Sequence, residues 1–141
     1  MPLHHLKLTL TDDMHRVHAA LRHDLERLPA VLAAPAEARR FLAELRDHLG
    51  QHFRGEEEDG YMAAVLKQRP QDERAVQKLL AEHAPLMKEL DALVRQAETA
   101  VRIDEGFRAR ISAWAEMLRR HEAEENVLVE DAFNQDIGQK D

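Results

Sequence analysis

Histidine and glutamate residues recur in this sequence at spacings that place them on one face of a helix. Two of the nine histidines are followed by a glutamate four residues later, and two further histidines stand on separate helical segments. Residues four apart lie on the same side of a helix, about 6 Å apart along its axis. Imidazole nitrogens and carboxylate oxygens are donors for iron, manganese and zinc. The six candidate ligands are His18, His52, Glu56, His83, His121 and Glu125.

Each candidate stands where the apolar pattern requires a core residue. In the first segment the stripe reads Met14, His18, Leu21, Leu25, Leu28, and the other three segments are interrupted in the same way. A carboxylate buried without a partner costs several kcal/mol, so two in one core need cations or a metal to compensate them. The alternative is a bundle with hydrogen-bonded core histidines, in which Glu125 belongs to a solvated charged face.

The arrangement repeats in the two halves of the chain. Each half has one segment that contributes a histidine, followed by one that contributes a histidine and a glutamate. Two such halves related by a pseudo-twofold axis present two pairs of imidazoles and two bridging carboxylates. This ligand set predicts a dinuclear site for metals such as iron or manganese, about 3.5–4 Å apart. The Glu-x-x-His pattern of ferritin-like proteins is absent, because leucine stands three residues before histidines 48, 52, 83 and 121.

Four helical segments must position these residues. Ala, Leu, Glu, Arg and Gln dominate the 141 residues, with only five glycines and five prolines, and such residues favour helix. Apolar periodicity predicts helices over residues 12–28, 36–67, 72–101 and 104–132. Short connections between long helices make consecutive helices antiparallel neighbours. We therefore expect an all-α fold: one domain over residues 1–141, an up-down-up-down antiparallel four-helix bundle with a dinuclear metal site in its core.

Proline and glycine mark points where these helices are interrupted. Pro29 is expected to end the first helix, and Pro85 lies inside the third. In the second helix, the candidate ligands are flanked by Gly50, Gly55 and Gly60. Each glycine destabilises a helix interior by about 1 kcal/mol relative to alanine. The alternative for this segment is a helix that ends near Gly60 and restarts.

Composition excludes several classes of protein. The net charge is −7, which disfavours binding to a phosphate backbone, so no nucleic-acid partner is expected. No apolar run approaches the 20 or so residues of a membrane helix, and no secretory signal is evident, so we expect no membrane partner and a cytoplasmic location. The chain has no cysteine, which excludes disulfides, thiolate metal sites and iron–sulfur clusters. The sequence does not identify protein partners.

The candidate ligands and their neighbours resemble the hemerythrin-like (HHE cation-binding) family over nearly the whole chain. The motifs that carry the resemblance are His18-Ala-Ala-Leu-Arg, His52-Phe-Arg-Gly-Glu56-Glu57, Glu82-His83-Ala-Pro-Leu and His121-Glu-Ala-Glu-Glu125-Asn126. The resemblance implies a non-heme di-iron centre with two iron ions and a bridging oxo, hydroxo or peroxo ligand. It implies that His18 and His52 bind one iron and that His83 and His121 bind the other. Glu56 and Glu125 would bridge them.

Two positions depart from the oxygen-carrying members of that family. Those members have a fifth histidine one turn after the third-helix histidine, where this chain has Met87. They also have an aspartate five residues after the fourth-helix histidine, where this chain has Asn126. The chain instead resembles the four-histidine branch, which is associated with peroxide or nitric-oxide chemistry and with iron or oxygen sensing. One imidazole fewer also opens a coordination position for a small ligand.

The resemblance leaves more than one class of function open. We expect a non-heme di-iron protein whose partner is a small diatomic or peroxide ligand: O2, peroxide or NO. An enzyme of this kind would be a peroxidase- or catalase-like oxidoreductase, with no catalytic residue assigned beyond the metal ligands. The alternatives are iron or oxygen sensing or buffering, and reversible O2 binding without turnover. Residues that could add a ligand or a hydrogen bond near the metals are His15, His48, Met87 and Tyr61.

Overall fold

Amphipathic helices account for almost all of the chain that the structure describes. The structure is a computed structural model, in which residues 3–58 and 61–138 are described, and side chains over residues 15–58 and 62–133. No strand occurs within these ranges. The elements are α1 (Leu3–Val31), α2 (Pro35–Glu58), α3 (Tyr61–Gln68), the 3₁₀ turn η1 (Pro70–Asp72), α4 (Glu73–Thr99) and α5 (Glu105–Gly138).

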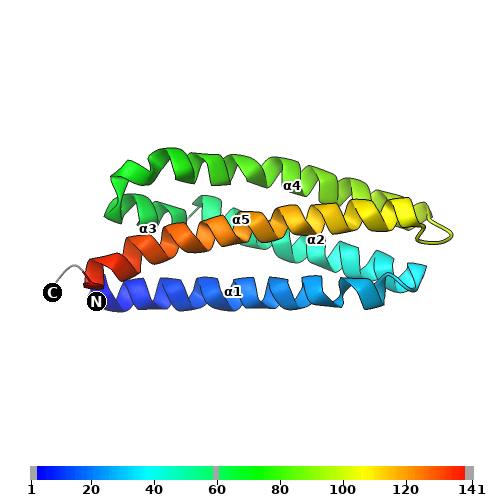
Figure 1. Ribbon diagram of the computed structural model, residues 1–141, viewed down its shortest axis with the longest axis horizontal. Helices are drawn as coiled ribbons and strands as arrows, with labels where there is room; N and C mark the ends of the chain where they lie inside the picture. Colours follow the sequence, from blue (N-terminus) through cyan, green and yellow to red (C-terminus); the bar gives the residue numbers. More distant parts are fainter. Residues whose placement is uncertain (1–2, 59–60, 139–141) are drawn as a thin grey trace.

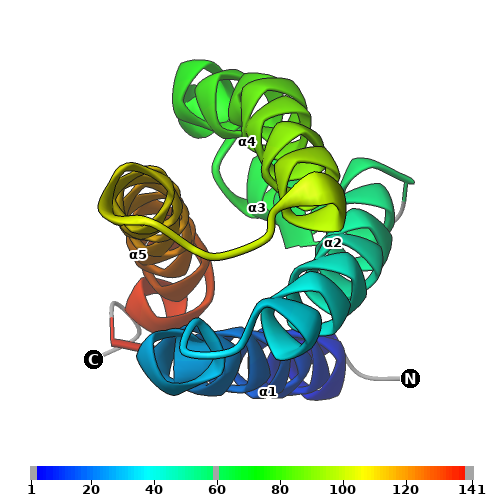
Figure 2. The ribbon, with the colours of Figure 1, turned by 90° about the vertical axis from the view of Figure 1, so that its right-hand side faces the viewer.

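The four long helices run alternately up and down the long axis of the molecule (Figure 1). Viewed from one end, they surround a common centre (Figure 2). α1 packs against α2 and α5, and α4 packs against the same two helices. The short helix α3 lies near one end of the bundle, in contact with α5. The all-α antiparallel four-helix bundle expected from the sequence is confirmed.

The boundaries predicted for the first and last helices were wrong at three points. α1 begins at Leu3 rather than near residue 12, and it continues through Pro29 to Val31. Proline removes one N–H donor, but the helical bond from Leu32 N to Leu28 O (2.9 Å) still forms beyond it. α5 extends to Gly138 rather than 132. Potential cap residues near position 12 favour a helix start by only about 1 kcal/mol, too little to stop a helix that can continue.

The second predicted helix, over residues 36–67, is two helices. α2 ends at Glu58 and α3 begins at Tyr61, so the alternative of an end near Gly60 and a restart is the correct one. A glycine in a helix interior costs about 1 kcal/mol. Three consecutive glutamates, residues 56–58, also oppose the negative end of the helix dipole. Both effects favour ending α2 directly after the residues that face the core.

The described side chains form two apolar clusters with a polar layer between them. The larger cluster is built from all four long helices and includes Leu25, Leu49, Leu90 and Trp114. The smaller one consists of Met62, Val65, Val76, Leu79, Val129, Ala132 and Phe133. On α4 and on α5, the histidines fall between residues of one cluster and residues of the other. The two clusters therefore fix α4 and α5 on both sides of that polar layer.

Two hydrogen bonds help to set the position of α5. The Asp104 carboxylate accepts a bond from Phe107 N (2.8 Å), which caps the helix start. Farther along, Trp114 Nε1 donates to the Leu86 carbonyl oxygen (2.9 Å), one residue after Pro85 on α4. Trp114 is buried, so its indole N–H cannot bond to water. The bond to the Leu86 carbonyl oxygen satisfies this N–H instead. It fixes α5 against α4 directly beside the polar layer.

Candidate metal centre

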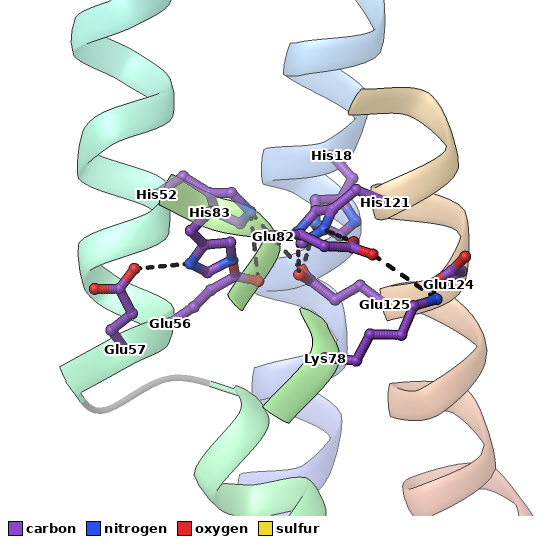
Figure 3. A network of polar contacts seen from close by, with 10 residues as sticks. All are labelled: His18, His52, Glu56, Glu57, Lys78, Glu82, His83, His121, Glu124 and Glu125. Atoms are coloured by element: carbon purple, nitrogen blue, oxygen red, sulfur yellow. Dashed lines mark hydrogen bonds and ion pairs between the residues drawn. The ribbon is translucent and has the colours of Figure 1, made fainter. Parts of the chain in front are cut away.

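All six candidate ligands converge in the polar layer between the two apolar clusters (Figure 3). α1 contributes His18, α4 contributes His83, and the other four come in pairs from α2 and α5. The six side chains are between 1% and 6% exposed. Their burial follows from their position on the same helical faces as the core leucines. The helices thus bring together side chains that are distant in sequence.

The six residues form two overlapping groups that share both carboxylates. One group is His18, His52, Glu56 and Glu125, and in it the potential ligand atoms all lie within 4.8 Å of one another. The other group meets the same limit and consists of His83, His121 and the same two glutamates. This arrangement has the form of two adjacent cation positions with carboxylates common to both.

Distances show that each carboxylate reaches imidazoles of both groups. Glu125 Oε1 lies 2.9 Å from His18 Nε2, and Glu125 Oε2 lies 3.4 Å from His121 Nε2. Glu56 Oε1 lies 3.2 Å from His83 Nε2, and Glu56 Oε2 lies 3.6 Å from His52 Nε2. A carboxylate that spans two imidazole pairs in this way is placed to bridge two cations.

When the imidazoles are neutral and donate from Nδ1, and the carboxylates are ionised, several of these buried atoms have no hydrogen bond among the residues that the structure describes. They are the Nε2 atoms of His18, His83 and His121, both carboxylate oxygens of Glu56, and Oε1 of Glu125. Buried polar atoms are normally hydrogen-bonded, and leaving one unsatisfied costs about 1–3 kcal/mol. Metal ions would satisfy these lone pairs. The donor set therefore fits a metal centre better than it fits a hydrogen-bonded core.

In three of the imidazoles the second ring nitrogen, Nδ1, is hydrogen-bonded to a residue other than the six candidate ligands. His18 Nδ1 donates to Asn126 Oδ1 (2.8 Å), and His83 Nδ1 donates to Glu57 Oε2 (2.7 Å). His121 Nδ1 donates to Glu82 Oε1 (2.8 Å). In the neutral imidazole the proton is then held on Nδ1 and the lone pair of Nε2 faces the centre, which is the tautomer that a metal ligand needs.

Sequence reasoning did not assign these three hydrogen-bond partners. A usable signal was present, because Glu57 follows Glu56, Glu82 precedes His83 and Asn126 follows Glu125. Adjacent helical residues point about 100° apart, so the neighbour of a core-facing residue lies at the edge of the helix interface. From that edge each acceptor reaches a ligand on a different helix.

Burial and mutual contact shift the pKa values of the two glutamates in opposite directions. Burial, reinforced by the nearby Glu125, raises the pKa of Glu56 to about 11. Burial also acts to raise the pKa of Glu125, but contacts with His121 and His18 outweigh it and leave that pKa well below its ordinary value. Without metal, Glu56 therefore carries a proton at neutral pH while Glu125 is ionised.

The pKa values of the four imidazoles are also shifted in two directions. Burial lowers the pKa of His18 and of His121, but their contacts with Glu125 reverse the effect and the pKa of each is raised. Burial lowers the pKa of His52 to about 4 and lowers the pKa of His83 as well. In the metal-free centre Glu56 thus holds its proton most tightly, and His18 and His121 bind protons more readily than His52 and His83 do. Metal ions would have to displace these protons.

Glu122 is a further buried carboxyl that the sequence analysis did not single out. The residue is 7% exposed, and burial raises its pKa to about 7. It borders a cavity of about 300 Å³ beside His18 and Arg22. Only its position next to His121 in a glutamate-rich run could have drawn attention to it.

The weaker candidates His15 and His48 lie outside both groups. His15 is exposed and contacts Glu130 Oε1 at 3.4 Å; His48 is also exposed. Met87 is partly buried, packs against the larger apolar cluster and borders a cavity beside His83. The side chain of Tyr61 lies outside the described residues.

The fold and the site together define a helical-bundle protein with histidine and glutamate groups in its core that could bind metal. The model of the hemerythrin HHE cation binding domain matches residues 9–132, and the chain belongs to this family. No curated protein and no solved structure matches the chain. Among the described residues, no helix has both the length and the apolar character needed to cross a membrane.

Proposed function

We propose that the chain binds two iron ions in this centre and reacts there with small oxygen species. The observation that carries the proposal is the pair of overlapping groups that share Glu56 and Glu125. In this assignment His18 and His52 hold one iron, and His83 and His121 hold the other. Imidazole and carboxylate donors suit iron, whereas the thiolates that favour softer metals are missing from this cysteine-free chain.

The number of ligands supports a reactive centre. Two imidazoles and two shared carboxylates leave open coordination positions at each metal, as reactive sites require. Bound iron would supply redox chemistry and an affinity for O2, peroxide or NO. The thioether of Met87 is a poor ligand for ferric iron, so the fifth imidazole of an oxygen carrier has no replacement there. Peroxide turnover is therefore favoured over reversible oxygen carriage.

The surroundings restrict what can reach the metals. The six ligands are buried, while cavities of about 150 to 490 Å³ border His121, His18 and His83 from different sides. Such an enclosure excludes large substrates and suits a peroxide or diatomic molecule. Around the metals, the residues of this chain orient the imidazoles and exclude bulk water.

Metal content and absorption spectra test the dinuclear centre. We expect about two irons per chain in the wild type, an absorption band typical of an oxo-bridged pair, and loss of both in Glu56→Ala. Glu44→Ala, an exposed position on the same helix, is the matched control and should retain both. A wild type without iron, or with one zinc that Glu56→Ala does not affect, would overturn the proposal.

Peroxide assays test the reaction itself. The iron-loaded protein should consume hydrogen peroxide in the steady state, and Glu56→Ala should not. An iron-loaded protein that forms a stable complex with O2 but does not turn peroxide over would favour a carrier or sensor. Iron binding with no response to either molecule would favour iron buffering.

A further inference from the structure

The hydrogen bonds behind the imidazoles differ between the two groups. His83 and His121 both donate from Nδ1 to carboxylates, those of Glu57 and Glu82, at 2.7 and 2.8 Å (Figure 3). In the other group, His18 donates to the neutral amide oxygen of Asn126 at 2.8 Å. One group therefore has a carboxylate behind each imidazole, and the other has a neutral acceptor behind at least one.

This difference has a chemical consequence for any metal in the centre. A carboxylate that accepts the N–H of a ligating imidazole raises the basicity of that ligand. Hydrogen bonds to a charged acceptor are also stronger than those to a neutral one. Two such carboxylates on one metal position make its imidazoles better electron donors, which favours tighter binding and a higher oxidation state.

We propose that Glu57 and Glu82 make the two metal positions unequal, so that the His83–His121 position is the tighter-binding and more electron-rich of the two. The inference rests on the proposed dinuclear centre. Both glutamates act through the imidazoles and are positioning residues. Asn126 has the opposite effect, because it leaves His18 a weaker donor.

Packing holds both carboxylate–imidazole pairs in place. The ring of His83 stacks on Phe53, with centroids 3.8 Å apart and planes 5° from parallel. Lys78 Nζ lies 3.8 Å from Glu82 and 3.1 Å from Glu124, so Glu82 has a cation on the side away from the ring. These contacts fix the side chains in the geometry that the hydrogen bonds need.

Cobalt titration separates the two positions without relying on activity. We expect wild-type protein to bind two Co²⁺ ions with different affinities. Glu57→Gln and Glu82→Gln keep an oxygen acceptor but remove its charge, and each should weaken the tighter step by about 10–100-fold and leave the weaker step unchanged. Asn126→Asp should strengthen the weaker step. Glu116→Gln, which removes the charge of an exposed carboxylate that contacts Arg119 and no imidazole, should change neither.

Mössbauer spectra of protein loaded with ⁵⁷Fe give a second readout that a loss of stability alone would not produce. Wild-type protein should show two doublets of equal area, and Glu57→Gln with Glu82→Gln should shift one of them. Equal weakening of both steps, or no change in either, would overturn this inference while leaving the two-metal centre intact. Binding of fewer than two Co²⁺ ions by the wild type would overturn both.

Discussion

Glu125 Oε1 lies 2.9 Å from Nε2 of His18, with both side chains almost fully buried. Glu125 stands on the last helix of the chain and His18 on the first. Their contact therefore links the first helix to the last within the polar layer of the bundle. It also explains why Glu125 keeps its charge in the core, since the imidazoles beside it compensate for its burial.

Glu56→Gln should separate metal binding from folding. Glu56 carries a proton in the metal-free protein at neutral pH because its pKa is raised to about 11. Gln resembles that neutral form and does not have to take up a proton on folding. We expect the free energy of unfolding of metal-free protein to rise by about 1–3 kcal/mol at pH 7, while bound iron falls from two per chain to less than one.

Urea unfolding and metal analysis of the same samples check both parts. Glu44→Gln is the control, because Glu44 is exposed on the same helix. A Glu56→Gln protein that keeps two irons would contradict the role of this carboxylate. A large loss of stability without metal would contradict its neutral state.

Metal uptake should release protons. Glu56 loses its proton on binding because its pKa is raised to about 11, and the raised pKa values of His18 and His121 increase the number of protons released as the pH is lowered. We expect release of at least one proton per chain at pH 7, and an affinity that falls as the pH is lowered. Calorimetry with Co²⁺ in buffers of different ionisation enthalpy measures the number. Equal heats in all buffers would contradict this account.

Glu122 should make the metal-free protein less stable as the pH rises. Its pKa is about 7 in the folded chain against an ordinary value of 4.5, so the folded state binds the proton more tightly than the unfolded state does. The stability due to this proton is present below pH 4.5 and is lost as the pH rises through 7. Glu122→Gln should remove this loss, raising the free energy of unfolding by up to about 3 kcal/mol above pH 7.

Urea unfolding of metal-free protein from pH 5 to pH 8 tests this expectation. The exposed Glu116 on the same helix provides the control variant Glu116→Gln. If wild type and Glu122→Gln lose stability in parallel over this range, Glu122 does not carry the extra proton.

Trp114→Phe should destabilise the bundle without removing the metals. The indole is 1% exposed and its N–H donates to the Leu86 carbonyl oxygen. The variant loses this bond and leaves a small void, at a cost of about 1–3 kcal/mol. Thermal unfolding should show the loss, and iron analysis should still give two per chain. Loss of iron at unchanged stability would be the opposite of what this geometry predicts.

The bundle could be predicted from the regular apolar stripes. Its six central residues could be predicted because each of them interrupts such a stripe. His52 and Glu56, for example, occupy positions where the pattern otherwise has leucine. Periodicity alone is enough to show which face of a helix is buried, and a buried carboxylate demands compensation. The sequence therefore predicted the set of residues that the structure brings together.

The hydrogen-bond partners of the imidazoles could not be predicted in the same way. Glu57 and Glu82 lie beside the apolar stripe rather than on it, and each acts on a ring from another helix. Which rings they reach depends on how the helices are rotated and offset in the bundle. The end of α2 at Glu58 likewise depends on a balance of about 1 kcal/mol between glycine and helix continuation, which local sequence does not decide.

Among the side chains that the structure describes, the polar layer lies between a larger and a smaller apolar cluster. In the metal-free chain this boundary contains buried ionisable groups such as Glu56 and His52, whose desolvation costs free energy. We therefore expect the smaller cluster, with α3 and the adjoining ends of α4 and α5, to exchange its amide hydrogens by local opening at a lower free energy than the rest. Metal binding would cross-link the helices at this boundary and merge the two parts into one cooperative unit.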